Sequence, residues 1–205
     1  VAARDPRALF DEIAPALLVR GMTSAVAARR AFADTAFGRA FLALLAVGSD
    51  NAHAASRAAD FALSPFSGLS LRSASDLDAT WRGDRLADAA TIRRDLTAAS
   101  EAAADAFAAL DIDDFEAAVA AFERSAARLD GRDPAFRSEQ LAAMGAARRF
   151  AAASAGAGVA PLEALSHLER ASVPAHACTS AEGGCEGAPA VRFMTLDDAA
   201  ELPAC

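Results

Sequence analysis

The side chains with the clearest chemical potential lie near the end of the chain, where one histidine and all three cysteines follow Pro174. One residue separates His176 from Cys178, six residues separate Cys178 from Cys185, and Cys205 is the last residue. Imidazole and thiolate groups are the ligands that Zn²⁺ prefers in tetrahedral sites, and a bound metal can order a segment with few apolar side chains. His176, Cys178, Cys185 and Cys205 are therefore candidate metal ligands, with zinc as the candidate metal.

The spacing of these residues leaves two alternatives open. Structural zinc sites usually begin with a pair of cysteines two to four residues apart, and this chain has no such pair. A disulfide between Cys178 and Cys185 would close a short loop around Gly183 and Gly184 in an oxidising compartment. In a reducing compartment the same thiols would stay free. The Cys-x-x-Cys motif of redox enzymes does not occur in the sequence.

Other catalytic motifs are weakly represented. The remaining histidines, His53 and His167, lie in predicted helices, where a structural role is the ordinary interpretation, and no Gly-x-Ser-x-Gly motif occurs. Residues 64–74, rich in Ser, Gly and Pro, enter a predicted helix and are loosely similar to the phosphate loop of the small-molecule kinases that include galactokinase, homoserine kinase and mevalonate kinase. In that family the loop is tighter and follows strands, so an ordinary loop and helix cap is the preferred interpretation.

Composition excludes several classes of partner. The chain has 205 residues, a net charge of −8 and basic doublets only at scattered positions, which argues against a nucleic-acid-binding surface. Its longest strongly apolar run, 40–48, is nine residues, whereas a membrane-spanning helix needs about 20. The first residues lack the apolar segment of a secretory signal, and the number of cysteines is odd. These features favour a cytoplasmic protein with no membrane partner.

Helix start and stop signals predict an all-α domain over residues 1–172, followed by an irregular Cys/His-containing tail over 173–205. Asp5 and Pro6 are typical of a helix start, and Gly21 is typical of a helix end. Connections of two to four residues between the later helices indicate antiparallel hairpins or a bundle, with six to seven helices in all. Alanine fills 60 positions, which a GC-rich genome would explain without any function.

Apolar spacing predicts where the individual helices lie. A helical segment is expected over 24–47 and another from Asp50 or Asn51. Asp111 or Asp113 is expected to cap a further helix, Asp133 and Pro134 to open the next, and Pro161 to open a short last helix. Residues 190–196 have the composition of a strand, but the sequence shows no second strand to pair with it. Two apolar stripes are expected in the core: Ile92, Leu96, Ala99, Ala103, Phe107 and Leu110; and Phe115, Val119, Phe122, Ala126 and Leu129.

The stretch 114–124, Asp-Phe-Glu-Ala-Ala-Val-Ala-Ala-Phe-Glu-Arg, resembles the second helix of a tetratricopeptide repeat, with Phe115, Ala118 and Phe122 at the matching positions. The resemblance implies a helical hairpin. The preceding helix lacks the family's large residues, and no 34-residue period recurs, so no binding residue is transferred. An amphipathic hairpin of any origin would produce the same pattern.

Together these observations predict a non-enzymatic helical interaction or adaptor protein that binds a partner protein. One alternative is a metal- or redox-responsive regulatory protein that uses the Cys/His tail. Another is an enzyme whose site the sequence does not reveal. Neither the partner, the binding surface nor the oligomeric state follows from the residues alone.

Overall fold

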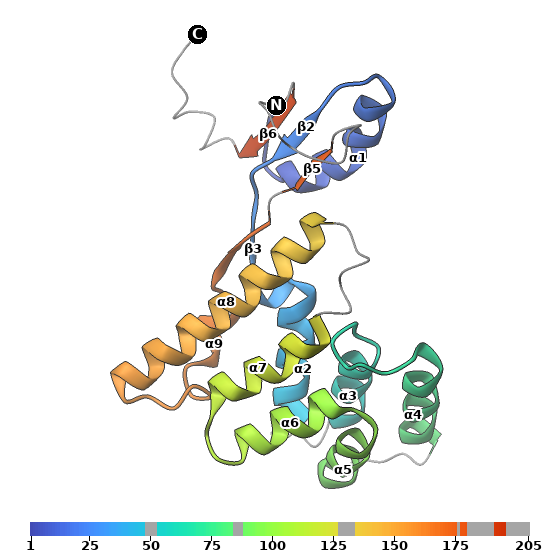
Figure 1. Cartoon of the computed structure of the whole chain (residues 1–205), viewed down its shortest axis with the longest axis vertical. Coiled ribbons are helices and arrows are strands. Elements are labelled where there is room, and N and C mark those ends of the chain that lie inside the picture. Colours follow the sequence, from blue (N-terminus) through green and yellow to red (C-terminus); the bar gives the residue numbers. More distant parts are fainter. Residues whose placement is uncertain (48–52, 84–87, 127–133, 176, 180–190, 196–205) are drawn as a thin grey trace. The chain divides into compact units, whose positions relative to one another are not determined.

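The computed structural model describes residues 1–47, 53–83, 88–126, 134–175, 177–179 and 191–195. Its described residues are mostly helical, with short strands as well (Figure 1), so the predicted all-α class holds only in its coarse form. The chain forms two compact units, described separately below. Unit 1 contains the described residues of 1–30, 133–142 and 172–205, and unit 2 those of 31–132 and 143–171.

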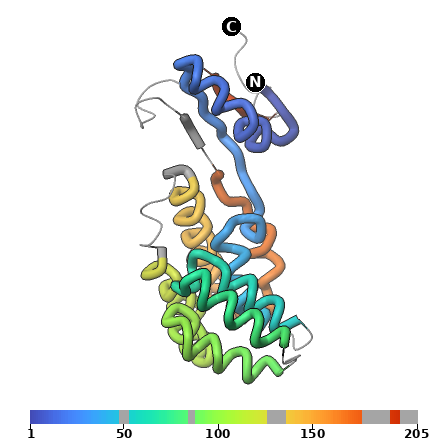
Figure 2. The backbone as a smooth tube through the Cα atoms, turned by 90° about the vertical axis from the view of Figure 1, so that its right-hand side faces the viewer, coloured from blue at the N-terminus to red at the C-terminus, as the bar shows by residue number. Residues whose placement is uncertain are grey.

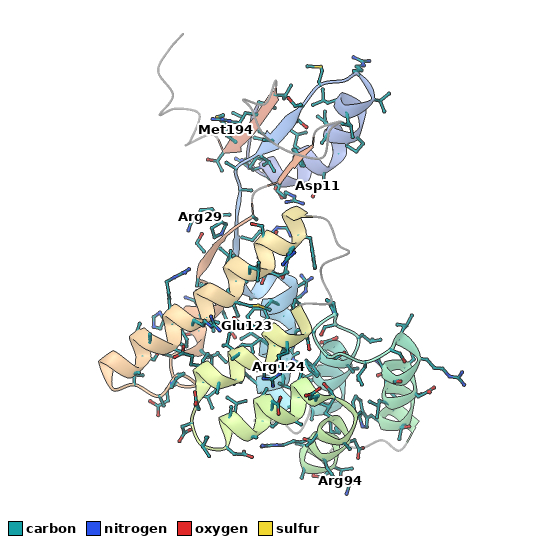
Figure 3. The ribbon with its side chains drawn as sticks, in the orientation of Figure 1. Asp11, Arg29, Arg94, Glu123, Arg124 and Met194 are labelled. Carbon is teal, nitrogen blue, oxygen red and sulfur yellow. The ribbon has the colours of Figure 1, made fainter. Side chains whose placement is uncertain are left out.

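Unit 1 has a four-stranded sheet in the order β1-β6-β2-β5. Its strands are β1 (Ala2–Ala3), β2 (Ser24–Val26), β5 (Ala177–Thr179) and β6 (Val191–Thr195). β6 is parallel to both β1 and β2, whereas β5 is antiparallel to β2. Figure 2 shows that segments from the two ends of the sequence come together in this unit. Register places Ala2 opposite Met194, which Figure 3 labels.

Helix α1 (Pro6–Val19) covers one face of this sheet. It begins as predicted, because the Asp5 carboxylate accepts a hydrogen bond from the Ala8 amide at 2.9 Å and Pro6 follows it. Pro15 lies inside the helix without ending it, and Gly21 follows with a φ of +71°. The buried side chains of α1 form an apolar cluster with those of the sheet and its flanking residues: Phe10, Ala14, Val26, Ala28, Ala175 and Phe193.

The predicted helical segment over 24–47 is wrong in its first part. This part contains β2 and β3 (Arg29–Ala31) instead of helix, and β3 pairs with β4 (Ser172–Pro174) in a second, two-stranded sheet. The cause is tertiary, because backbone groups of this segment bond to residues far along the chain: the Ala175 amide donates to the Ala28 carbonyl at 2.8 Å. Arg29, labelled in Figure 3, adds a 2.6 Å bond from Nε to the Ser172 hydroxyl. Local helix propensity is weak enough to be overridden in this way.

The expected strand near residues 190–196 is confirmed as β6, but the expectation that no strand pairs with it is wrong. Its neighbours are β1 and β2, two and three residues long. Strands this short carry no alternating apolar pattern that a sequence could reveal. The change of composition near Val173 coincides with β4, and the described residues beyond it pair with the beginning of the chain.

Unit 2 is helical in its described part. After the 3-10 turn η1 (Phe32–Asp34), it contains the helices α2 (Ala36–Val47), α3 (Ala54–Ala62), α4 (Leu71–Gly83), α5 (Ala89–Ala99), α6 (Glu101–Leu110), α7 (Phe115–Ala126), residues 143–157 of α8 (Pro134–Ala157), and α9 (Leu165–Glu169). Among the described residues of the whole chain, no helix combines the length and apolarity needed to cross a bilayer.

Phenylalanine rings form the centre of unit 2. Phe37 contacts the rings of Phe32, Phe41, Phe66 and Phe122 at centroid distances of 5.5–5.8 Å. These five side chains are fully buried. Such ring pairs are favourable beyond the area that they remove from water. The predicted core positions Phe115, Val119 and Phe122 are buried, whereas the other two positions of that stripe, Ala126 and Leu129, cannot be compared with the structure.

The predicted stripe from Ile92 to Leu110 is interrupted at Ser100, which ends α5 and begins α6. The Ser100 hydroxyl donates to the Ser67 carbonyl at 2.5 Å and accepts from the Ala103 amide at 3.2 Å. This side chain therefore stabilises the start of a new helix. As a consequence Ala99 is exposed, whereas Ile92 and Ala103 are buried.

Two other predicted helix starts are displaced. The carboxylate that caps α7 belongs to Asp114, not to Asp111 or Asp113, and accepts from the Ala117 amide at 2.9 Å. The last helix, α9, begins at Leu165 rather than at Pro161. The third helix, α3, begins at Ala54, and the predicted starts at 50 and 51 lie outside the described residues. The Asp114 side chain thus caps the start of α7, whereas no side-chain cap hydrogen bond from a described residue sets the first residue of α3 or α9.

The cap of α5 predicts a pH dependence. Asp88 accepts hydrogen bonds from the Thr91 hydroxyl at 2.6 Å and from the amides of Ala90 and Thr91 at 3.1 and 3.3 Å. The Thr91 hydroxyl is the main cause of a pKa of Asp88 below its usual 3.8. The stabilisation is thus complete above the usual pKa and is lost as the pH falls through the lowered folded value.

We expect a carboxyl NMR titration of Asp88 to have its midpoint below 3.8. In Thr91→Val, which lacks the hydroxyl, the midpoint should rise toward the usual value. A midpoint that is the same in both proteins would show that the hydroxyl does not set the pKa of Asp88.

Candidate functional site

The predicted metal ligands are only partly within the described residues. Cys178 lies in β5, where its Cα is in register with that of Ala25 in β2. His176, Cys185 and Cys205 lie outside the described residues. Within the part of the chain that the structure describes, no group of three or more His, Cys, Asp or Glu residues could hold a metal ion. The zinc site, the disulfide and the free thiols therefore all stay predictions.

Unit 2 contains a groove of about 740 Å³ that runs beside α2. We call it the α2 groove. Its lining comes from η1 and α2, which we call its floor, and from two further segments, which we call its walls: α3 with the residues that follow it, and the segment at α9. It is lined by Ala33, Ala36, Arg39, Ala40, Leu42, Ala43, Leu45, Ala46, Arg57, Asp60, Leu63, Ser64, Pro65, Leu162, Leu165 and Glu169.

Small side chains make up part of the floor of the α2 groove, beside Arg39, Leu42 and Leu45. Ala36, Ala40 and Ala43 follow one another at spacings of four and three residues, so they share one face of α2. Because a methyl group projects little beyond the backbone, a partner can approach the helix backbone closely along this face. Two aromatic side chains of the same helix, Phe37 and Phe41, do not line the groove and are fully buried in the core.

Two leucines at the walls of the groove are unusually exposed. Leu63, immediately after α3, is 50% exposed, and Leu162, before α9, is 55% exposed. A single exposed leucine is common on protein surfaces, whereas these two line the same groove and both present apolar surface to solvent. The groove is thus apolar inside and open to solvent.

Four charged side chains also line the α2 groove: Arg39, Arg57, Asp60 and Glu169. Arg39 donates from Nη1 to the Asp34 carbonyl at 2.9 Å, which holds the guanidinium near the start of α2. Among the described residues, none of the four forms a salt bridge. Arg57 and Asp60 are three residues apart on α3, so they lie on neighbouring positions of one face.

Elsewhere in unit 2, arginines are commonly paired. Arg82 contacts Asp78 at 2.7 Å, Arg93 contacts Asp111 at 2.6 Å, and Arg148 contacts Glu123 at 2.6 Å. Arg94 and Arg124, both labelled in Figure 3, pair with Asp95 and Asp105. The four charged side chains that line the α2 groove differ from these arginines, because they form no salt bridge among the described residues. They are therefore available to a ligand.

A second, smaller cavity of about 210 Å³ lies at the start of α6 and is mostly polar. Its Ser67 hydroxyl donates to the Ala62 carbonyl at 2.8 Å, its Ser100 hydroxyl bonds the Ser67 carbonyl, and its Arg124 pairs with Asp105. These contacts hold α3, α6 and α7 together. The main polar groups of this cavity therefore have a structural role. These groups include Ser67, which belongs to the Ser-rich loop that is similar to a phosphate loop.

No protein family, no curated protein and no solved structure matches this chain. The residues that resemble a tetratricopeptide helix belong to the loop before α7 and to α7, which packs against α6. Phe115, Ala118 and Phe122 are buried there, as in any amphipathic hairpin. Functional inference therefore depends on the geometry of the chain itself.

Sequence reasoning missed the residues of the α2 groove. The wall residues Arg57, Asp60 and Leu162 have no motif, because they come together only when α2, α3 and the α9 segment pack. One signal was present: the alanines at 36, 40 and 43 repeat with helical spacing. Interpreting alanine as a consequence of genome composition concealed that regularity.

Proposed function

We propose that this chain is a non-enzymatic interaction protein that binds a partner protein through the α2 groove. The observation that supports this most is the combination of an apolar, alanine-floored groove with exposed Leu63 and Leu162 at its walls. Burying these leucines against a partner would be favourable, because about 25 cal/mol is gained for each Å² of apolar surface removed from water.

The open form of the groove favours a protein partner over a small molecule. A volume of about 740 Å³ is compatible with either, because small-molecule pockets commonly measure about 300–1,000 Å³. Such pockets usually enclose most of their ligand, however, whereas six residues lining this groove are exposed: Arg39, Arg57, Asp60, Leu63, Leu162 and Glu169. A partner that lies along the surface would contact all of them.

Leu162→Asp is expected to weaken partner binding by about tenfold or more, because a carboxylate would have to be desolvated in an apolar contact. The probe is a helical peptide selected from a displayed library against the whole chain, and its Kd is measured by fluorescence anisotropy. Leu63→Asp should have the same effect. Both residues are exposed, so neither change should alter the stability of unit 2 by much more than about 0.5 kcal/mol.

Ile112→Asp is the matched control. Ile112 is 75% exposed and does not line the α2 groove. The Ile112→Asp substitution therefore introduces the same charge at an exposed apolar position of the same unit. Its Kd should stay within about twofold of the original. Equal weakening by Leu162→Asp and Ile112→Asp, or the failure of any peptide to bind, would contradict the proposed function.

A further inference from the structure

We infer that the occupant of the α2 groove is an amphipathic helix of a partner protein, with one acidic and one basic side chain about one helical turn apart beside its apolar stripe. The inference rests on the proposed function and adds the conformation and charge pattern of the partner. It follows from three features of the groove: its helical walls, its alanine floor and the order of the charges on α3.

The helical walls exclude binding by strand addition at this site. A peptide that adds to a sheet needs free backbone donors and acceptors on its receptor. Within α2 and α3 these groups are engaged in helical hydrogen bonds, apart from those at the helix ends. A helical occupant needs none of them, because its own backbone is paired internally and only its side chains enter the groove.

The alanine floor favours a helix that packs closely. Ala36, Ala40 and Ala43 leave room for the larger apolar side chains of a partner between the walls. α2 has 12 residues and is therefore about 18 Å long, so a partner helix lying along it would present about three turns. The apolar residues of such a helix would recur every three or four positions.

The charges on α3 determine the flanking residues of the partner. Arg57 and Asp60 both line the groove and are separated by three residues, a rise of about 4.5 Å along α3. A helix lying along this wall meets a positive charge and then a negative one. The complementary pattern is an acidic and a basic residue three or four positions apart, because that spacing matches the rise.

The remaining charges are consistent with a partner of mixed charge. Arg39 and Glu169 add one charge of each sign, so the four side chains that line the groove sum to zero. A uniformly acidic partner would gain from the two arginines but would be repelled by Asp60 and Glu169, and by the chain's net charge of −8. A uniformly basic partner would gain from Asp60, Glu169 and the net charge, but would be repelled by Arg39 and Arg57 within the groove.

A charge-swap experiment tests the inference. Helical peptides with a fixed leucine stripe and flanking positions varied among Asp, Lys and Ala are selected on the original chain. They are then measured on the double variant Arg57→Glu with Asp60→Arg, which keeps the net charge. The best peptide should lose about fivefold or more in affinity at low salt. A peptide with its Asp and Lys exchanged should recover most of this loss.

The control exchanges a salt bridge that lies away from the groove, Asp78→Arg with Arg82→Asp on α4, and should leave the Kd within about twofold. Peptides that depend on Leu162 but bind the swapped and original chains equally would overturn this inference and leave the proposed function intact. Peptides that do not bind at all would overturn both. The fluorescent apolar anion 8-anilinonaphthalene-1-sulfonate provides a further measurement. If the dye bound the original chain but not Leu162→Asp, and no peptide competed with it, the groove would instead be assigned to a small molecule.

Discussion

Phe122→Ala should lower the free energy of unfolding of unit 2 by about 3–5 kcal/mol, the cost of lost burial plus the cavity that remains. Phe122 has no exposed surface, and its ring lies 5.6, 5.4 and 5.8 Å from the rings of Phe37, Phe41 and Phe61. It therefore joins α7 to both α2 and α3. Because the surrounding rings are rigid and already in contact, they can close little of the space.

The measurement is denaturation of the original and variant chains in urea, with the slope m compared as well as the midpoint. Phe150→Ala is the matched control, since Phe150 is only partly buried and its ring contact is with Phe115 at 5.9 Å. The control should cost about 1–2 kcal/mol. If the two variants lost equal stability, Phe122 would not be the centre of the core.

Gly38→Ala is expected to destabilise unit 2 by about 3 kcal/mol or more, at or above the upper end of ordinary overpacking. A Cβ at this position would lie 1.8 Å from the Phe32 carbonyl oxygen, 2.7 Å from its carbon and 2.8 Å from the Thr35 hydroxyl. Two of these atoms belong to the backbone and cannot rotate away. The turn η1 would have to move relative to α2.

The same change should impair binding in the α2 groove. Thr35 donates from its hydroxyl to the Phe32 carbonyl at 2.8 Å and accepts from the Gly38 amide at 2.9 Å, so this contact fixes the start of α2. The floor residues Ala36 and Ala40 lie on either side of Gly38. We therefore expect the Kd for the selected peptide to rise even at temperatures where the variant stays folded.

Gly145→Ala provides the comparison. Gly145 lies inside α8, and the nearest atom to an added Cβ is the far end of the Arg149 side chain at 3.4 Å. Alanine should stabilise the helix there by about 0.5–1 kcal/mol. Thermal unfolding followed by circular dichroism measures both variants. A stability for Gly38→Ala equal to that of the original chain would mean that the close approach of η1 to α2 does not exist in solution.

Local signals in the sequence located much of the helical structure. Asp5 and Pro6 begin α1, Pro134 is the first residue of α8, and the apolar spacing of Phe115, Val119 and Phe122 gives the buried face of α7. Each of these depends on residues within one or two turns of one another. The first residues of the helices were predicted less well, as the starts of α7 and α9 demonstrate.

The strands and the candidate site were not accessible in the same way. β2 becomes a strand because its backbone pairs with β5 and β6, about 150 residues later in the sequence. Arg57, Asp60 and Leu162 become neighbours of one groove only through the packing of three separate segments. Neither relation leaves a local period in the sequence.

By itself, the sequence determined that the chain is mostly helical, where most helices lie and which phenylalanines of α7 are buried, because capping and periodicity act over a few residues. Only the tertiary structure decided that both ends of the sequence share one sheet, that Ser100 divides a continuous apolar stripe, and that charges on α2, α3 and α9 line one groove. These features depend on hydrogen bonds and packing between distant segments, whose free energies outweigh local conformational preferences.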